Sequence, residues 1–425
     1  MTAIAPQPAA LEAALQQALA HQRAGRLSEA ERLYRSILQA RPNHPGVSNN
    51  LGLALKDQGK LDEAAATFQR VIAVKPDDAM AHCNLGNVLR LQGRPDQAAA
   101  CYRRAIALRP DMALAHRNLG TVLCESDHLA EGLASFRRHA ELAYGKLESP
   151  AGASAPVPPH KVQHDREQQD YLNGVSTPAD QVSVLAKFHL EEGGRVAGHA
   201  VNPDASGGEI ATRWQTSRPQ IAVIDNLLSD EALAKLRRFC WGSTIWRKVY
   251  RDGYLGAMPE HGFACPLLAQ IADELRSTYP AIVGRHPLLQ FWGFKYDSRL
   301  SGINIHADFA AVNVNFWITP DEANLDPQSG GLVVWDTPAP LGWDFAKYND
   351  DVPAARDFLK RAGARPVTVP YRANRAVIFD SDLFHETDRI AFKDGYLNRR
   401  INITLLYGRR EMAAKESSGQ QASSS

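Results

Sequence analysis

The chain has 425 residues, more than one ordinary hydrophobic core organises, so two or three domains are expected. Hydrophobic residues make up 44% of the chain and charged residues 22%, which is the composition of a globular protein. Lys and Arg number 48 against 47 Asp and Glu, so the overall charge gives no indication of a nucleic-acid partner or an anionic membrane.

The five cysteines are scattered and lack the close pairs of a zinc site or a disulfide framework. We therefore expect reduced thiols in a cytoplasmic protein. The amino-terminal segment has no basic region followed by an apolar run, and no stretch approaches about 18 consecutive apolar residues, so neither a signal peptide nor a membrane span is expected.

Residues 11–146 contain an internal repeat with a period of 34 residues. Glycine, alanine, proline and aromatic positions and a Leu-Gly pair all recur at this step. The recurring residues are Gly25, Gly59 and Gly93; Ala30, Ala64 and Ala98; Pro42, Pro76 and Pro110; Leu51-Gly52, Leu85-Gly86 and Leu119-Gly120; and Tyr34, Phe68, Tyr102 and Phe136.

This pattern predicts four helix–turn–helix units. The glycines suit the left-handed position where a first helix ends, the alanines allow two helices to approach closely, and the prolines fall between units. Asp127 and Gly132 replace the expected Gly and Ala in the last unit, as in a terminal repeat that caps the array. The segment resembles tetratricopeptide repeats, which implies an α-helical solenoid.

Three asparagines, Asn50, Asn84 and Asn118, recur at the same period just before the Leu-Gly pairs. This placement resembles the asparagine ladder in the repeats of O-linked N-acetylglucosamine transferase, which bonds the backbone of an extended peptide. The resemblance implies that these residues bind a peptide or protein substrate. The alternative is that the amides cap or bridge neighbouring helices.

Residues 147–215 are predicted to be a linker with short helices. The stretch 147–160 is rich in Pro, Ala and Ser, and residues 161–172 and about 178–190 favour helix. His164 and Asp165 are adjacent, and adjacent residues on a helix do not face one site. We therefore expect an exposed or docking helix here rather than metal ligands.

Residues 216–412 change to short β-rich segments separated by Gly, Pro and Asp turns. This pattern predicts a double-sheet jelly roll, also called a double-stranded β-helix. The whole chain is thus predicted to be a multidomain α + β protein. Residues 413–425 are polar and are expected to form a disordered tail.

A candidate metal site lies within the β-rich segments. His306 and Asp308 are two positions apart at a strand end, so their side chains share a face. His385 follows the apolar segment 375–380 and supplies a third ligand. Two imidazoles and one carboxylate on one face of an octahedron are the arrangement of non-haem Fe(II) oxygenases.

Arg400 begins the predicted strand 400–408, where alternation puts Arg400, Asn402 and Thr404 on one face. An inward arginine is costly unless it meets an anion, and its planar fork suits a carboxylate. Arg399 offers a competing guanidinium that faces the opposite way.

Residues 219–408 resemble the prolyl 4-hydroxylase-like branch of the 2-oxoglutarate oxygenases. The matching segments are AVIDNLLS, the Lys-Tyr pair at 295–296, the H-x-D triplet, GGLVVW, NRAVIFDSDLFHE and RRINITLLYG. The resemblance implies that His306, Asp308 and His385 bind Fe(II), and that Arg400 pairs with the distal carboxylate of 2-oxoglutarate. Tyr296 and Asn402 would also contact this cosubstrate, although Asn402 stands where the family more often has Ser.

The function that this resemblance implies is a dioxygenase that uses O2 and 2-oxoglutarate to hydroxylate a peptide or protein held by the repeats. Asp308 favours hydroxylation over halogenation, because related halogenases carry a small residue in its place. Two alternatives remain open. One is a small-molecule oxygenase whose repeats serve assembly, and the other is a non-catalytic scaffold.

Overall fold

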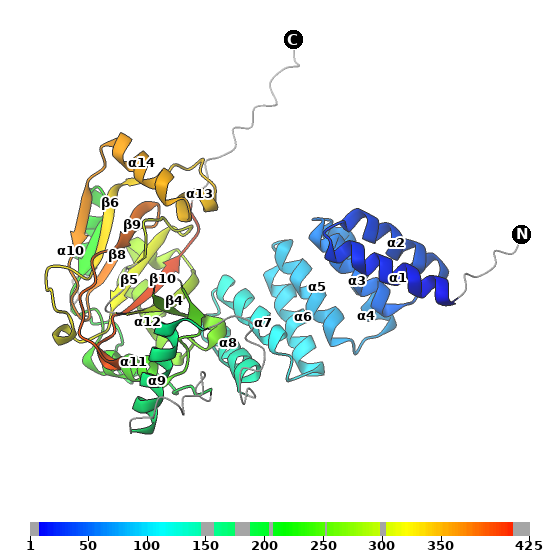
Figure 1. Cartoon of the computed structure of the whole chain (residues 1–425), viewed down its shortest axis with the longest axis horizontal. Coiled ribbons are helices and arrows are strands. Elements are labelled where there is room, and N and C mark those ends of the chain that lie inside the picture. Colours follow the sequence, from blue (N-terminus) through cyan, green and yellow to red (C-terminus); the bar gives the residue numbers. More distant parts are fainter. Residues whose placement is uncertain are drawn as a thin grey trace, which may run out of the picture. The chain divides into compact units, whose positions relative to one another are not determined.

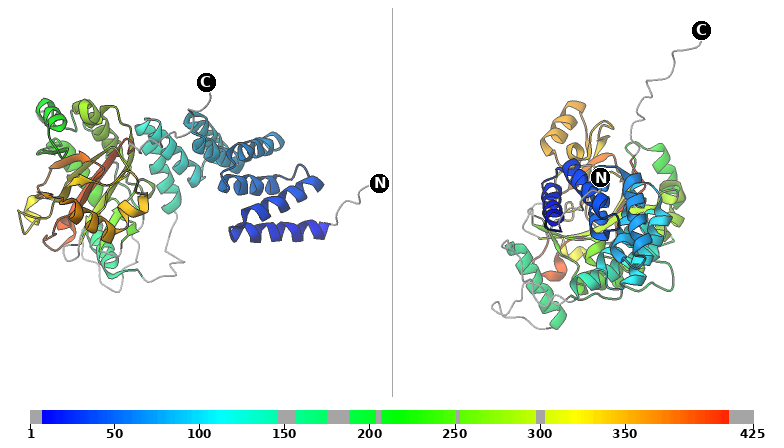
Figure 2. Two further views of the ribbon diagram at one scale, coloured as in Figure 1. Left: turned by 90° about the horizontal axis from the view of Figure 1, so that it is seen from above. Right: turned by 90° about the vertical axis from the view of Figure 1, so that its right-hand side faces the viewer.

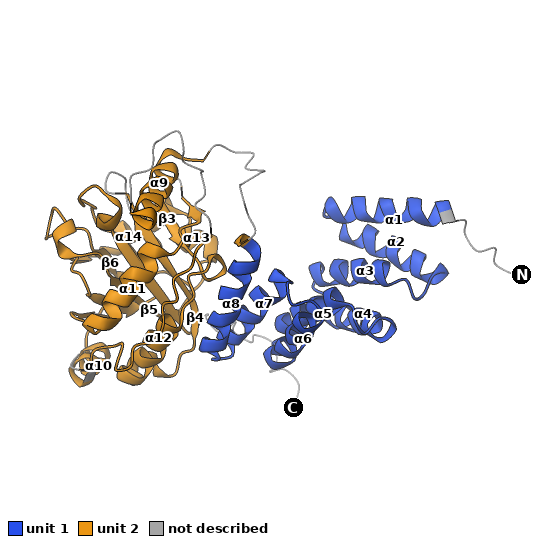
Figure 3. Cartoon of the chain, turned by 90° about the horizontal axis from the view of Figure 1, so that it is seen from below, with its two compact units in different colours: residues 1–143 blue, residues 144–425 orange. Residues whose placement is uncertain are grey.

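The structure is a computed structural model that describes residues 8–145, 157–174, 188–203, 207–250, 253–297 and 303–410 (Figure 1). The chain divides into two compact units, residues 1–143 and 144–425 (Figure 3). The predicted tail, 413–425, and most of the helix predicted near 178–190 lie outside the described residues. Among the residues that are described, no helix combines the length and apolar character needed to span a membrane.

Unit 1 is built from helices that pack in consecutive pairs. They are α1 (Pro8–Arg23), α2 (Leu27–Ala40), α3 (Pro45–Asp57), α4 (Leu61–Val74), α5 (Ala79–Leu91), α6 (Pro95–Leu108), α7 (Ala113–Glu125) and α8 (Leu129–Tyr144). Gly25, Gly59 and Gly93 turn the chain within successive pairs at φ values of 72°, 75° and 70°. Asp127 adopts a φ of 64° at the equivalent turn of the last pair. The predicted helix–turn–helix units are therefore present.

The recurring Leu-Gly pair has a steric cause. An added Cβ on Gly52 would lie 2.6 Å from the ring of Phe68, and one on Gly86 would lie 2.6 Å from the ring of Tyr102. Both rings are fully buried. Glycine thus recurs because the first helix of each unit must let the aromatic ring of the second helix reach its backbone.

We predict opposite effects for two glycine substitutions within α3. Gly52→Ala should destabilise unit 1 by about 1–3 kcal/mol, because the new methyl group overlaps the Phe68 ring. Gly46→Ala should be neutral or stabilise by up to about 1 kcal/mol, because its Cβ meets only ordinary contacts with His44. Urea denaturation of the two variants measures both effects, and equal stability would contradict this packing account.

Unit 2 contains the described strands and the helices around them (Figures 1 and 2). Its helices are α9 (Pro159–Asn173), α10 (Gly207–Thr216), α11 (Asp230–Gly242), α12 (Pro266–Thr278), α13 (Phe345–Asn349) and α14 (Val352–Ala362). Its strands are β1 (Ile221–Ile224), β2 (Lys248–Val249), β3 (Tyr254–Ala257), β4 (Leu288–Tyr296), β5 (Val312–Trp317), β6 (Leu332–Pro338), β7 (Pro366–Val369), β8 (Ala376–Asp380), β9 (Leu383–Thr387) and β10 (Ile401–Tyr407).

The described strands form two antiparallel sheets. A seven-stranded sheet has the order β1-β8-β5-β10-β4-β3-β2, and a three-stranded sheet has the order β7-β6-β9. Apolar side chains from both sheets, among them Trp317 and Phe379 on one and Val334 and Val369 on the other, make one core. The two sheets therefore pack against each other through these side chains.

Strand alternation gives the large sheet two different faces. Phe291 on β4 is part of an aromatic row that runs through Phe263 to Phe239 on α11, and Tyr407 on β10 donates to the Ala272 carbonyl of α12 over 3.1 Å. Side chains of opposite parity, such as Tyr296 and Thr404, line a cavity instead. Helices thus cover one face, and the other face holds the candidate site.

Helix α9, in the region predicted as a linker, belongs to unit 2. His164, Asp165 and Gln168 are all buried. The Gln168 amide donates to the Ser243 carbonyl and to the Tyr396 hydroxyl, both over 2.9 Å. The helix is therefore docked and not exposed, and its His-Asp pair is part of the packing.

Candidate functional site

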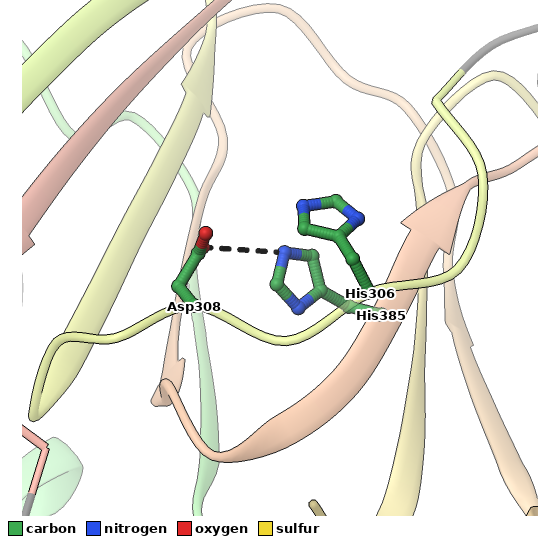
Figure 4. A group of neighbouring side chains, drawn as sticks. All are labelled: His306, Asp308 and His385. Carbon is green, nitrogen blue, oxygen red and sulfur yellow. Dashed lines mark ion pairs between the residues drawn. The ribbon is translucent and has the colours of Figure 1, made fainter. Parts of the chain in front are cut away.

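Two histidines far apart in the sequence face each other across an isolated antiparallel bridge. His306 lies before β5 and His385 lies on β9. Each donates its backbone N–H to the carbonyl of the other, over 3.0 and 2.8 Å. Their rings lie side by side with centroids 4.3 Å apart (Figure 4). The backbone, rather than the side chains, thus sets the spacing of the two imidazoles.

Asp308 completes the group. Its backbone N–H donates to the Ser381 carbonyl over 3.1 Å, and one carboxylate oxygen lies 3.5 Å from Nε2 of His385 (Figure 4). One ligand atom from each of His306, Asp308 and His385 lies within 4.8 Å of the other two. In the described part of the chain this is the only such group of three His, Cys, Asp or Glu side chains. The three predicted ligands are therefore brought together.

In both imidazoles, Nδ1 faces a backbone carbonyl. Nδ1 of His306 lies 2.8 Å from the Asn304 carbonyl, and Nδ1 of His385 lies 3.1 Å from the Leu383 carbonyl. A carbonyl only accepts, so each Nδ1 carries a proton, and in a neutral ring this leaves the lone pair on Nε2. This is the tautomer that a metal ion requires when it binds through Nε2.

Burial dominates the electrostatics of the group. Burial lowers the pKa of His385 well below its usual value, and neighbouring His306 lowers it further, so His385 is neutral. Burial raises the pKa of Asp308, against the opposing effects of His306 and of a hydrogen bond from Asn313. A buried carboxylate beside the neutral His385 imidazole is an environment that a divalent cation stabilises.

The ligands line a cavity between the two sheets. Its walls are Trp292, Phe294, Tyr296, Ile303, His306, Asp308, Asn313, Asn315, Leu332, His385, Thr387, Arg400, Asn402 and Thr404. Every predicted iron or cosubstrate residue is among them. The structure thus places these predicted residues around one space.

Arg400 is the cation of this cavity and is 1% exposed. Its Nε donates to the Gly330 carbonyl over 2.6 Å and its Nη2 to the Gly331 carbonyl over 3.1 Å. Its guanidinium carbon lies 4.7 Å from the Tyr296 ring centroid. Its Nη1 is buried and has no hydrogen-bond partner among the described residues. A buried guanidinium with an unsatisfied donor is suited to binding an anion.

Arg399 does not share this position. Its Nε lies 2.9 Å from a Glu167 carboxylate oxygen, and its Nη1 lies 3.6 Å from Asp297. Strand alternation separates the two neighbouring arginines, so that one lines the cavity and the other pairs with α9.

The sequence analysis missed Asn313, Asn315, Trp292 and Thr387. Asn313 and Asn315 had a visible signal, because they alternate with apolar residues in a fully buried strand. Trp292 and Thr387 had no such signal in the sequence, because each lines the cavity only through the pairing of its strand.

The repeating asparagines occupy equivalent positions on α3, α5 and α7. Asn50 is half-buried, and Asn84 is only 6% exposed. The Asn118 amide donates to Oδ1 of Asn87 on α5 over 2.8 Å, which bridges two helices. Peptide binding by this row stays a prediction, with Asn118 also serving the contact between repeats.

Comparisons with known proteins match unit 1. Family models match residues 52–93, described as TPR repeat, and residues 79–112 and 12–44, described as tetratricopeptide repeat. The amino-terminal part of the chain therefore consists of tetratricopeptide repeats. The sequence matches no curated protein.

Solved structures similar to about a third of the chain include two forms of MamA. The crystal structure of MamA is 21% identical, covers 31% of this chain and 78% of its own, and gives a TM-score of 0.30. MamA 41-end from Desulfovibrio magneticus RS-1 is 24% identical, with 32% and 77% covered and a TM-score of 0.31. An O-GlcNAc transferase mutant of Thermobaculum terrenum is 29% identical, with 37% and 31% covered and a TM-score of 0.32.

We predict that a divalent cation stabilises unit 2 through this group. Mn(II) at 100 times its Kd should add about 2.7 kcal/mol to the free energy of unfolding, seen as a higher Tm. Asp308→Ala should abolish the increase. Asp336→Ala should retain it, because Asp336 pairs with Arg365 outside the cavity. An unchanged Mn(II) effect in Asp308→Ala would contradict the ligand assignment.

Proposed function

We propose that unit 2 is an Fe(II)- and 2-oxoglutarate-dependent dioxygenase that hydroxylates a peptide or protein substrate. One observation carries the proposal. A His306–Asp308–His385 group and the buried, unsatisfied Nη1 of Arg400 line the same cavity. The two packed antiparallel sheets around that cavity support a jelly-roll fold for the unit.

The side chains fit Fe(II). Two imidazoles and one carboxylate from one side leave coordination positions open for a cosubstrate and O2. When bound, the iron would supply O2 activation, coupled to the decarboxylation of 2-oxoglutarate to succinate and CO2 and to the hydroxylation of the substrate. The residues themselves turn each Nδ1 toward a backbone carbonyl and bring one ligand atom of each within 4.8 Å of the other two.

The polar and charged side chains of the cavity also suit 2-oxoglutarate. A dicarboxylate that reaches from the metal to Arg400 would give Nη1 its missing acceptor and neutralise the buried guanidinium. The Tyr296 hydroxyl lies 3.5 Å from Oγ1 of Thr387 and also interacts with the Arg400 guanidinium, so the same carboxylate would meet both side chains. Burial lowers the pKa of Arg400, which a bound anion would oppose.

The tetratricopeptide repeats support a protein partner, since such repeats bury one face of each helix pair and present another for binding. A non-catalytic scaffold is the second candidate function. The repeat matches by themselves support it as well as they support an enzyme. The unsatisfied Nη1 of Arg400, in the same cavity as the three predicted metal ligands, favours catalysis, because a scaffold has no need of a buried guanidinium donor turned into a cavity.

We predict that replacing Arg400 changes the KM for 2-oxoglutarate far more than replacing the adjacent Arg399. Arg400→Ala should raise the KM for 2-oxoglutarate by the equivalent of about 2–3 kcal/mol, because a charge-assisted contact is lost. Arg399→Ala is the matched control and should change this KM little, because Arg399 pairs with Glu167. Succinate formation at varied 2-oxoglutarate measures both, and a larger effect at Arg399 would contradict the assignment.

The activity itself is tested by anaerobic reconstitution with Fe(II) and 2-oxoglutarate, followed by exposure to O2. We expect succinate formation and, with copurified proteins or a peptide library, a mass gain of one oxygen on a discrete set of peptides. Asp308→Ala is the control for background oxidation. Succinate formation no greater in the wild type than in this variant would refute the proposal.

A further inference from the structure

A chain of buried polar side chains leads away from Asp308 into the large sheet. The Asn313 amide donates to a carboxylate oxygen of Asp308 over 2.6 Å, and the Asn315 amide donates to Oδ1 of Asn313 over 2.5 Å. Oδ1 of Asn315 in turn accepts from the Asn402 amide over 2.8 Å and from the Thr404 hydroxyl over 2.9 Å. These four residues are called the amide chain below.

All four residues of the amide chain are buried, with exposures from 0% to 6%. Asn313 and Asn315 lie on β5, and Asn402 and Thr404 lie on the neighbouring strand β10. Asn315 is directly opposite Thr404 in the register of the two strands. The bonds from Asn402 and Thr404 to Asn315 therefore depend on the pairing of β5 with β10, whereas Asp308, Asn313 and Asn315 are close in sequence.

The carboxylate fixes the direction of every bond in the amide chain. An ionised Asp308 only accepts, so Asn313 must turn its NH2 group toward it and its oxygen toward Asn315. Asn315 must then donate to that oxygen, and its own oxygen is left to accept from β10. The NH2 groups of Asn313, Asn315 and Asn402 thus each point along the chain toward its Asp308 end.

Stability alone does not account for these side chains. The alternate residues of the same strands, such as Val314 and Leu405, are buried and apolar, and they pack without polar partners. Replacing a buried polar cluster by well-packed apolar groups is often neutral or stabilising. Polar residues occur here on the one face that leads to Asp308.

We propose that Asn313 is a positioning residue for the metal-binding carboxylate, and that Asn315, Asn402 and Thr404 orient Asn313. This inference rests on the proposed metal site. Asn313 holds Asp308 in one rotamer while the two histidines are fixed by their backbone bridge. The amide chain acts on the metal only through Asp308, so its members bind no metal themselves.

The test is the affinity for Co(II), titrated anaerobically into chelator-treated full-length protein and followed by visible absorption. Asn313→Leu should weaken Co(II) binding by about 10- to 100-fold and alter the absorption envelope, because the carboxylate loses its fixed rotamer. Asn315→Leu should have a smaller effect. Thr404→Val should have the smallest effect, and Thr404→Ser should bind like the wild type.

Thr319→Val is the matched control for the Thr404 pair. Thr319 is also buried, and its hydroxyl donates to the Arg399 carbonyl and accepts from the Ile401 N–H, outside the amide chain. This variant should lose stability in a thermal melt without losing Co(II) affinity. The Thr404 and Thr319 variants keep the test valid even if Asn313→Leu fails to fold.

Two results overturn the inference in different ways. If the wild type binds no Co(II), both the proposed function and the amide chain's role fail. If the wild type binds Co(II) but Asn313→Leu or Thr404→Val binds it equally well, the role of the amide chain is refuted and the proposed metal site is not. Equal losses in Thr404→Val and Thr319→Val would also refute it, because destabilisation would then explain both.

Discussion

The candidate site depends on two backbone hydrogen bonds, those that His306 and His385 exchange between the segment before β5 and strand β9. Two further main-chain bonds hold the same segment, because Ala307 donates to the Tyr348 carbonyl of α13 over 3.0 Å and Asp308 donates to the Ser381 carbonyl before β9. Three ligands from two distant segments are thus held by main-chain contacts. Such a site is formed before any ligand binds, so little conformational entropy remains to be lost on binding.

The buried polar side chains of the large sheet lie, with one exception, on one face, which also carries apolar residues such as Trp317 and Phe379. The cavity face carries the amide chain, Tyr296 and Arg400, and the opposite face packs on α11 and α12. Lys295 is the exception on the helix-covered face, where its Nζ lies 3.4 Å from the ring centroid of Tyr396 and burial lowers its pKa well below the usual value. Elsewhere on the sheet, the buried polar groups are concentrated where a metal and an anion would be bound.

The sequence predicted what is periodic or local and missed what depends on register. The 34-residue step predicted the helix pairs, because each glycine turn and aromatic contact recurs within one unit. Alternation along 400–404 correctly put Arg400 and Arg399 on opposite faces. Alternation marked Asn313 and Asn315 as polar residues in an apolar strand, but the bonds of Asn315 to Asn402 and Thr404 follow from the pairing of β5 with β10. The docking of α9 was not predictable, because Gln168 bonds to Ser243 and Tyr396, far along the chain.

The central claim is that one cavity holds a metal at His306, Asp308 and His385 and a dicarboxylate between that metal and Arg400. A crystal structure of the protein with Mn(II) and 2-oxoglutarate, grown without O2, tests it most directly. The account predicts an anomalous peak for Mn(II) between the two Nε2 atoms and the Asp308 carboxylate, with a cosubstrate carboxylate on Nη1 of Arg400. Mn(II) bound elsewhere, or 2-oxoglutarate that leaves Arg400 without an acceptor, would contradict the account.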